Sequence, residues 1–188
     1  MKKLLVLAAA ALVGLGAQAK DFVDEIDFSK VYVGGNIGVW HNQTDDYTSA
    51  SILPEIGYNF NQKWTFGTQI GYQYIGDGDV HNNSFVLNPY ARYTFYRAGM
   101  VQLFCDGGVD FALGATGGDH IDTDTSVVFG IGFKPGVALN VHKHVSIVAH
   151  LGFLGYKGAN DAAEMGGFKK GFGFDFSNAL NFGFYYNF

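Results

Sequence analysis

The sequence predicts an all-β fold, an eight-stranded antiparallel up-and-down transmembrane β-barrel with short turns at one end and longer loops at the other. The first observation is segment 171–188, where every second residue from Phe172 to Phe188 is large and mostly aromatic, with one interruption at Asn178. A period of two indicates one extended strand with an apolar face and a small or polar face. Soluble strands usually span about 5 to 6 residues, so this strand suits lipid on one side and a polar lumen on the other.

Composition supports the same fold class. Charged residues form 15% of the chain, against about 25% in typical soluble domains, and glycine, at 27 of 188 residues, has about twice its usual share. After residue 19 no apolar run reaches the roughly 18 residues that a membrane-spanning helix needs. A secreted β-sandwich is the alternative for such a chain. The acidic net charge of -5 argues against nucleic acid as a partner.

The N-terminus predicts export. Lys2 and Lys3 precede an apolar run over residues 4–17, which ends in the small-x-small site Ala17-Gln18-Ala19. This pattern is typical of a cleavable secretory signal peptide. We therefore expect three parts: a signal peptide over 1–19, a periplasmic lead-in of mixed charge over 20–30, and the barrel domain over 31–188.

Alternation of apolar and polar residues defines the remaining strands. The segment from Trp64 to Tyr74 is the clearest, and its eleven residues match the about 9 to 11 that cross a bilayer at a tilt. Connections then alternate between about 3 to 4 residues and about 8 to 14 residues, as in barrels with short periplasmic turns and longer outer loops. The predicted strands are 31–40, 51–60, 64–75, 84–95, 100–114, 125–140, 144–156 and 171–188. The predicted long loops are 41–50, 76–83, 115–124 and 157–170.

A proline recurs in three of these strands, at Pro54, Pro89 and Pro135, each followed by alternating apolar positions and a short turn. The repeating unit is therefore a β-hairpin. Proline donates no ladder hydrogen bond, so its recurrence predicts a bulge or bend that is used three times. The alternative is that a stable barrel merely tolerates three weak positions.

These features together resemble the small bacterial outer-membrane β-barrel family that includes OmpA-like and OmpX-like barrels, also grouped as porin-family proteins. The resemblance covers residues 31–188 and implies the outer membrane of a Gram-negative-type bacterium, with outer-membrane lipids and the outer-leaflet glycolipid as surroundings. A periplasmic peptidoglycan-binding domain is not expected here. Phe188, in phase with Phe184 and Tyr186, resembles the C-terminal aromatic signal that the barrel assembly machinery recognises in this family, so we expect this machinery as a partner.

The lumen-facing positions of the predicted strands carry a polar network. Carboxylates beside a histidine can do acid–base chemistry, but an eight-stranded barrel is only wide enough for its own side chains. We therefore expect structural ion pairs, because an unpaired charge in a narrow lumen is costly. A proton- or ion-conducting thread is the alternative. The inward residues are Glu55, Arg92, Asp106, Asp110, Lys134, His150 and Asp175.

The predicted outer loops combine histidine with aspartate, and the sequence predicts neither a metal nor another cofactor there. The third loop has alternating oxygen ligands that do not follow EF-hand spacing, so a solvated acidic loop is expected. A metal site shared by three loops is the alternative. The residues concerned are His41, Asp45 and Asp46, then Asp77, Asp79 and His81, and finally Asp119, His120, Asp122 and Asp124.

Two further sets have simple interpretations. Lys157, Lys169 and Lys170 flank the fourth loop, where we expect interfacial lysines that extend to water; contact with anionic groups of the glycolipid is the alternative. Cys105 is the single cysteine, so no internal disulfide forms. It falls on the apolar face of its strand as a small hydrophobic residue.

The sequence predicts a structural or surface-interaction role, in envelope integrity or adhesion, with a possible extracellular ligand that the residues do not identify. A narrow pore for ions or small solutes is the alternative. Bulk diffusion through the barrel is not expected, because general porins use about 16 to 18 strands. The resemblance also includes lipid A acyltransferases and deacylases, which need a nucleophile and base on the lipid-facing rim. Because His142 and His144 fall in a turn and His150 in the lumen, we do not expect an enzyme.

Overall fold

A computed structural model describes residues 27–42, 47–118, 121–166, 168, 170–175 and 181–188. The predicted signal peptide, residues 20–26 of the predicted lead-in, and Asn178 lie outside these residues. Within the described part of the chain, no helix is long and apolar enough to span a membrane.

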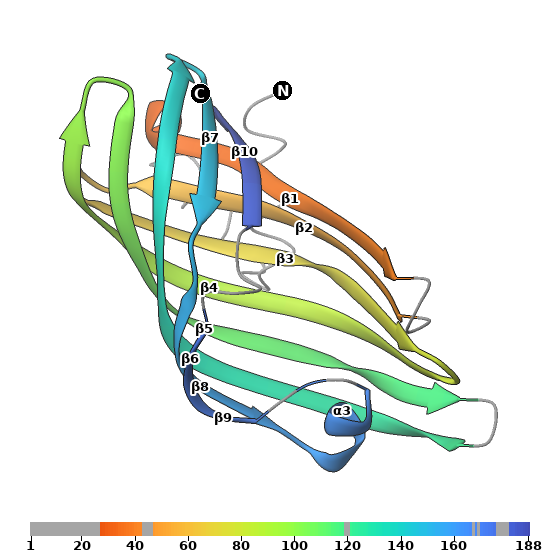
Figure 1. Ribbon diagram of the computed structural model, residues 1–188. Helices are drawn as coiled ribbons and strands as arrows, with labels where there is room; N and C mark the ends of the chain where they lie inside the picture. The colour runs from red at the N-terminus through yellow and green to blue at the C-terminus, as the bar shows by residue number, and fades with distance from the viewer. Residues whose placement is uncertain (1–26, 43–46, 119–120, 167, 169, 176–180) are drawn as a thin grey trace, which may run out of the picture.

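The described residues are almost entirely strand (Figure 1). The seventh pass of the chain consists of β7 and β8, and the eighth consists of β9 and β10, so ten strand segments make eight passes. The strands are β1 (Val31–Asn42), β2 (Tyr47–Asn59), β3 (Trp64–Asp77), β4 (Val80–Ala98), β5 (Val101–Gly118), β6 (Ile121–His142), β7 (Val145–His150), β8 (Phe153–Ala159), β9 (Gly171–Asp175) and β10 (Asn181–Asn187). The described part of the chain also contains two short helices, η1 (Phe28–Lys30) and α3 (Asp161–Met165).

The strands form a closed antiparallel ring. The hydrogen-bonded order is β5-β4-β3-β2-β1-β10-β7-β6, and β5 pairs with β6 to complete it. The last strand meets the first between the pairs Tyr32↔Asn187 and Gly35↔Phe184. β8 pairs with the other half of β6, and β9 pairs with β8. The predicted fold class, an eight-stranded antiparallel barrel closed by its last strand, is confirmed.

Alternation places apolar side chains on the outside of the barrel. On β6, Val127, Phe129 and Ile131 are exposed, whereas the alternate residues Ser126 and Val128 are buried. The same outward row continues on the last pass in Phe172, Phe174 and Phe184, with Phe172 78% exposed. A water-soluble monomer rarely exposes a contiguous apolar surface of this extent, so this face suits lipid.

The predicted outer loops are too long. The connection predicted at 76–83 is a tight turn at Gly78 and Asp79, with Gly78 at a φ of +57°. Most of 115–124 and part of 41–50 likewise belong to strands. Beyond the lipid both faces of a hairpin meet water, so a polar sequence there does not mark the end of a strand. β4, β5 and β6 reach 19, 18 and 22 residues, well beyond the about 9 to 11 needed to cross a bilayer.

The fourth predicted loop contains α3, which packs inside the barrel. The Asn160 side chain caps the helix by accepting a hydrogen bond of 3.1 Å from the Ala163 amide. Ala163 is fully buried in a cluster with Val86, Ala112 and Val128 of three neighbouring strands. Figure 1 shows α3 at the opposite end of the molecule from the C-terminus.

A β-bulge separates β7 from β8. The β6 ladder runs through Gly136↔His150 and resumes at Phe133↔Leu154, so three residues, 151–153, face two residues, Lys134 and Pro135. The extra residue exchanges the two faces of the strand. Uninterrupted alternation along the predicted strand 144–156 would place Phe153 outward with Val145 and Ile147, but Phe153 is only 8% exposed and Leu154 points out instead.

The three prolines do not behave alike. At Pro54 the β2–β3 ladder passes from Ile52↔Tyr72 to Glu55↔Gln69 without a change of register. At Pro89 the β4–β5 ladder skips two residues in the same way. The prediction of a bulge at each proline is thus correct only beside Pro135, where the neighbouring strand carries the extra residue. At the other two the missing N–H only interrupts the ladder locally.

Candidate functional site: the polar layer of the barrel lumen

Glu55 on β2 lies at the centre of a buried hydrogen-bonded cluster. Its carboxylate accepts hydrogen bonds from the hydroxyls of Tyr32 (3.0 Å), Tyr185 (2.8 Å) and Tyr90. A fourth comes from Gln69 Nε2 at 2.8 Å. Glu55 is 4% exposed, and a buried carboxylate needs such donors. The expectation that opposite charges neutralise one another is therefore wrong for Glu55, whose side-chain hydrogen-bond donors among the described residues are all uncharged.

Arg92, Asp106 and His150 form the second cluster of the layer. Arg92 Nε and Nη2 donate to the two Asp106 oxygens at 2.7 Å and 2.8 Å, in a bidentate pair. His150 Nε2 lies 2.8 Å from Asp106 Oδ2. The Arg92 guanidinium also stacks on the Phe104 ring, 4.0 Å from its centroid. The Arg92 and Asp106 side chains are only 8% and 4% exposed, so this is a desolvated ion pair.

A more exposed pair lies nearer α3. Lys134 Nζ donates to Asp110 Oδ1 at 2.6 Å, with side chains 30% and 25% exposed. Lys157 Nζ lies 4.6 Å from the centroid of the Phe153 ring. Both lysines line the inner cavity on this side of the layer. Lys157 is exposed, as expected, but the bulge before β8 places it on the lumen side of its strand.

Glycines on neighbouring strands make room for the inward aromatic rings. A Cβ atom at Gly57 would lie 2.3 Å from Tyr32 Cζ, and one at Gly136 would lie 2.4 Å from Phe104 Cζ. Both distances are far below van der Waals contact. An aromatic ring on one strand thus lies against the glycine backbone of the neighbouring strand. This close approach allows a narrow barrel to hold several aromatic side chains at one level.

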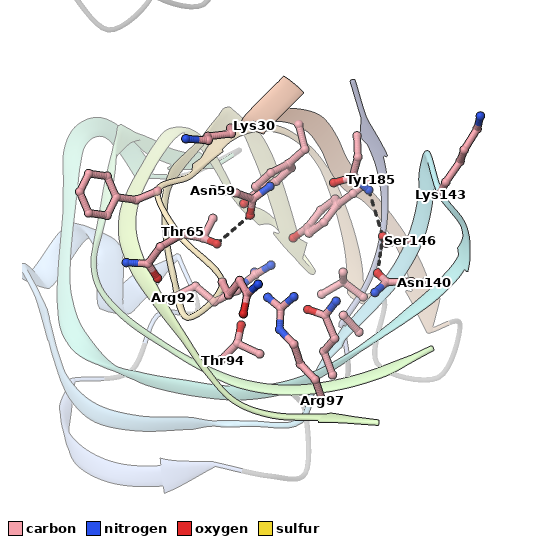
Figure 2. A pocket seen from close by; sticks show the side chains of 18 of the residues that line it. Lys30, Asn59, Thr65, Arg92, Thr94, Arg97, Asn140, Lys143, Ser146 and Tyr185 are labelled. Atoms are coloured by element: carbon pink, nitrogen blue, oxygen red, sulfur yellow. Dashed lines mark hydrogen bonds between the residues drawn. The ribbon is translucent and has the colours of Figure 1, made fainter. Parts of the chain in front are cut away.

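Two cavities meet this layer from opposite sides. The larger, about 680 Å³, contacts Tyr32, Arg92 and Tyr185 (Figure 2). The smaller, about 240 Å³, contacts Gln69, Tyr90 and His150. The two have no lining residue in common, and the side chains of the layer lie between them.

A further buried polar group lies beside α3. Asn82 Nδ2 donates to Thr116 Oγ1 and to Ser126 Oγ, both at 2.7 Å. Ser84 Oγ donates to Asn82 Oδ1. With the apolar cluster around Ala163, this group fills the lumen below the helix.

The structure brings six of the seven predicted lumen residues together in three groups: Glu55 alone, Arg92 with Asp106 and His150, and Asp110 with Lys134. For Asp175 only the backbone position is described, opposite Phe153. Sequence reasoning missed the importance of Phe104, Tyr32 and Tyr185. Tyr185 was visible as the one large residue on the small and polar face of its strand.

The remaining predicted sets lie apart from this layer. Among the described residues, no group of three or more His, Cys, Asp or Glu side chains could hold a metal ion, and Asp45, Asp46, Asp119 and His120 lie outside them. Lys170 Nζ donates to Glu164 Oε2 at 2.7 Å, which raises the pKa of Lys170. Cys105 is a free, half-buried thiol whose register partners are Tyr93 and Pro135.

The fold and the filled lumen define a small membrane barrel, and comparison with known proteins identifies its family. The family model described as "Outer membrane protein beta-barrel domain" matches residues 5–188. The chain belongs to this family, which implies the bacterial outer membrane. The crystal structure of Neisserial surface protein A (NspA) is similar, with a TM-score of 0.51, 13% sequence identity, and coverage of 84% of this chain and 96% of that chain. At this identity the likeness concerns the fold. No curated protein matches the chain.

Proposed function

We propose that this protein is a non-conducting outer-membrane barrel with a structural and surface-interaction role. The observation that carries the proposal is the polar layer, in which Glu55 and Asp106 bind side chains from strands on different sides of the barrel. Tyr185 on β10 and Tyr90 on β4 both donate to Glu55 on β2. These bonds cross the lumen at the level where an ion would have to pass.

The outer end supports the surface role. In outer-membrane barrels with an even number of strands the short turns face the periplasm, so we take the end that carries the C-terminus as periplasmic. The opposite end then extends outside the cell as the long hairpins of β3 to β6. Asp77, Asp79, Asp124 and Asp161 are exposed there, and they give the surface an acidic character that suits a cationic partner.

Planar bilayer recording on purified, refolded protein tests the first half of the proposal. We expect no steady conductance above background, because the hydrogen-bonded side chains of the layer lie between the two cavities. A variant with Arg92→Ser and Asp106→Ser, confirmed as folded by its heat-modifiable gel mobility, is the matched control for detecting an opened lumen. Steady conductance of the natural sequence would contradict the proposal and favour the narrow pore.

We also propose that the protein is not an enzyme. In the described part of the chain, the histidine hydrogen bonds run to Asp106, to the Asn187 carbonyl and between His142 and the His144 amide, and none reaches a serine hydroxyl. Such a pair is the usual way of activating a serine. Incubation with outer-membrane vesicles and analysis of lipid A by mass spectrometry tests this, and any change in acyl chains that depends on the protein would contradict it.

A further inference from the structure

The periplasmic mouth of the barrel is a cavity with a cationic lining. The cavity of about 680 Å³ is bounded by side chains from all eight strands of the closed ring. Among the described residues, its lining includes Lys30, Arg92, Arg97 and Lys143, together with His142, and no aspartate or glutamate. The second cavity, beyond the polar layer, is balanced, since Asp106 and Asp110 face Lys134 and Lys157 there.

This lining is unusual for the chain as a whole, which carries 17 acidic and 12 basic residues. The chain has only two arginines, Arg92 and Arg97, and both lie in this cavity. Three of the segments that line the mouth, 59–65, 94–102 and 138–148, contain no acidic residue, and Asp27 lies beside Lys30 of a fourth. Positive charge is therefore concentrated at one end of an acidic protein.

Two of the four cations, Arg97 and Lys143, have no carboxylate partner among the described residues. Arg92 is neutralised by Asp106, and Lys30 Nζ lies 3.8 Å from Asp27 with both side chains about half exposed. Among the described residues, no carboxylate lies within salt-bridge distance of Arg97 or Lys143. Figure 2 shows Arg97 reaching toward the middle of the cavity, whereas Lys143 points away from it.

Neutral polar side chains complete the wall. Asn59 accepts a hydrogen bond of 2.8 Å from Thr65, and Ser146 donates to Asn140 at 2.8 Å and accepts from Asn187 at 3.1 Å. These bonds hold the wall around the guanidinium of Arg97. A planar guanidinium donates two parallel hydrogen bonds to a phosphate or carboxylate, which a lysine ammonium cannot do.

We propose that this periplasmic cavity binds a phosphate-type oxyanion, with Arg97 as its main ligand and Lys30 as a second cation at the rim. The source of the phosphate is either a soluble periplasmic compound or the headgroup of an anionic inner-leaflet lipid. The cavity opens away from the outer surface, so this site is independent of the surface role and of whether the lumen conducts.

The two arginines make a direct test possible. Protein labelled with ¹⁵N-arginine and refolded in a zwitterionic detergent gives two Nε–H signals, which Arg97→Gln assigns. On titration with inorganic pyrophosphate we expect a saturable shift of the Arg97 signal, while the Arg92 signal stays in place because its Nε is bonded to Asp106. Arg97→Gln should weaken binding, measured by calorimetry, by about tenfold or more, as expected for loss of a charge-assisted hydrogen bond.

Lys63→Gln is the matched control. Lys63 lies in the β2–β3 turn at the same end but outside the cavity lining, and its loss should change affinity by less than about twofold. An equal loss for Lys63→Gln and Arg97→Gln would overturn the proposal in favour of general charge attraction. The heat-modifiable gel mobility of each variant confirms that it is folded.

Nanodiscs separate the two sources. A pyrophosphate-dependent shift in phosphatidylcholine nanodiscs supports a soluble ligand, whereas an Arg97 shift that requires phosphatidylglycerol supports a lipid headgroup. The absence of both shifts would overturn the proposal. A pyrophosphate shift that appears only after Asp21, Asp24 and Glu25 are replaced by amides would also overturn the proposal. In that case the mouth of the natural protein would bind the chain's own acidic segment in place of an external phosphate.

Discussion

Replacement of Asp106 by asparagine should destabilise the barrel severely. The substitution keeps the shape of the side chain but leaves the Arg92 guanidinium, with its side chain 8% exposed, without a counter-charge. It also weakens the contact to His150. Removing one partner of a buried ion pair costs about 3 to 5 kcal/mol, and we expect a loss in this range.

Asp110→Asn provides the matched control. Asp110 pairs with Lys134, and the two side chains are 25% and 30% exposed. Because water screens such a pair, we expect the free energy of unfolding to fall by no more than about 1 kcal/mol. The double variant Arg92→Met with Asp106→Leu should recover much of the loss from Asp106→Asn, because it removes both buried charges together.

The assay is reversible urea unfolding in phospholipid micelles, followed by tryptophan fluorescence, with the folded fraction checked by gel mobility. The free energy of unfolding of each variant is compared with that of the natural sequence. A loss below about 1 kcal/mol for Asp106→Asn, or equal losses for Asp106→Asn and Asp110→Asn, would refute the view that burial makes the first pair critical.

Three further predictions concern packing, docking and assembly. Gly57→Ala places a methyl group 2.3 Å from the Tyr32 ring. It should therefore lower the free energy of unfolding by about 1 to 3 kcal/mol. Gly173→Ala, with open space at its Cβ, should change the free energy of unfolding little in the same urea assay. Ala163→Arg should prevent α3 from packing in the lumen, and limited proteolysis should then cut segment 157–170 faster; an unchanged rate would contradict the described burial. Deletion of Phe188 should reduce insertion into the outer membrane without affecting export, and an unchanged amount of heat-modifiable barrel in outer-membrane fractions would contradict its role as an assembly signal.

Much of the barrel is visible in the sequence because lipid and lumen impose opposite chemistry on alternate residues. The outward row of Phe172, Phe174 and Phe184 follows directly from this alternation, as does the inward position of Arg92 and Asp106. The closing pair of β1 and β10 follows from the count of passes.

The errors arise where alternation stops being informative. A single extra residue after His150 reverses the faces, so Phe153 and Lys157 lie inside although the sequence pattern continues smoothly through them. Polar runs such as 76–83 resemble loops because hairpins in water need no apolar face. The hydrogen bonds that the three tyrosines donate to Glu55 depend on ring positions set by glycines of adjacent strands. The alternation pattern within a single strand does not predict such contacts between strands.

The bulge between β7 and β8 also divides the barrel into two regions of independent register. β6 pairs with β5 along nearly its whole length, but its other edge is shared by β7 toward the end that carries the C-terminus and β8 toward the opposite end. A one-residue shift in the pairing of β7, β10 and β1 would normally turn every side chain of the shifted strand to the opposite face of the barrel. Because the bulge can absorb such a one-residue change, an error at the seam need not disturb the outer hairpins. Insertions of one residue at Leu151 or Gly152 should accordingly be tolerated better than insertions within β6.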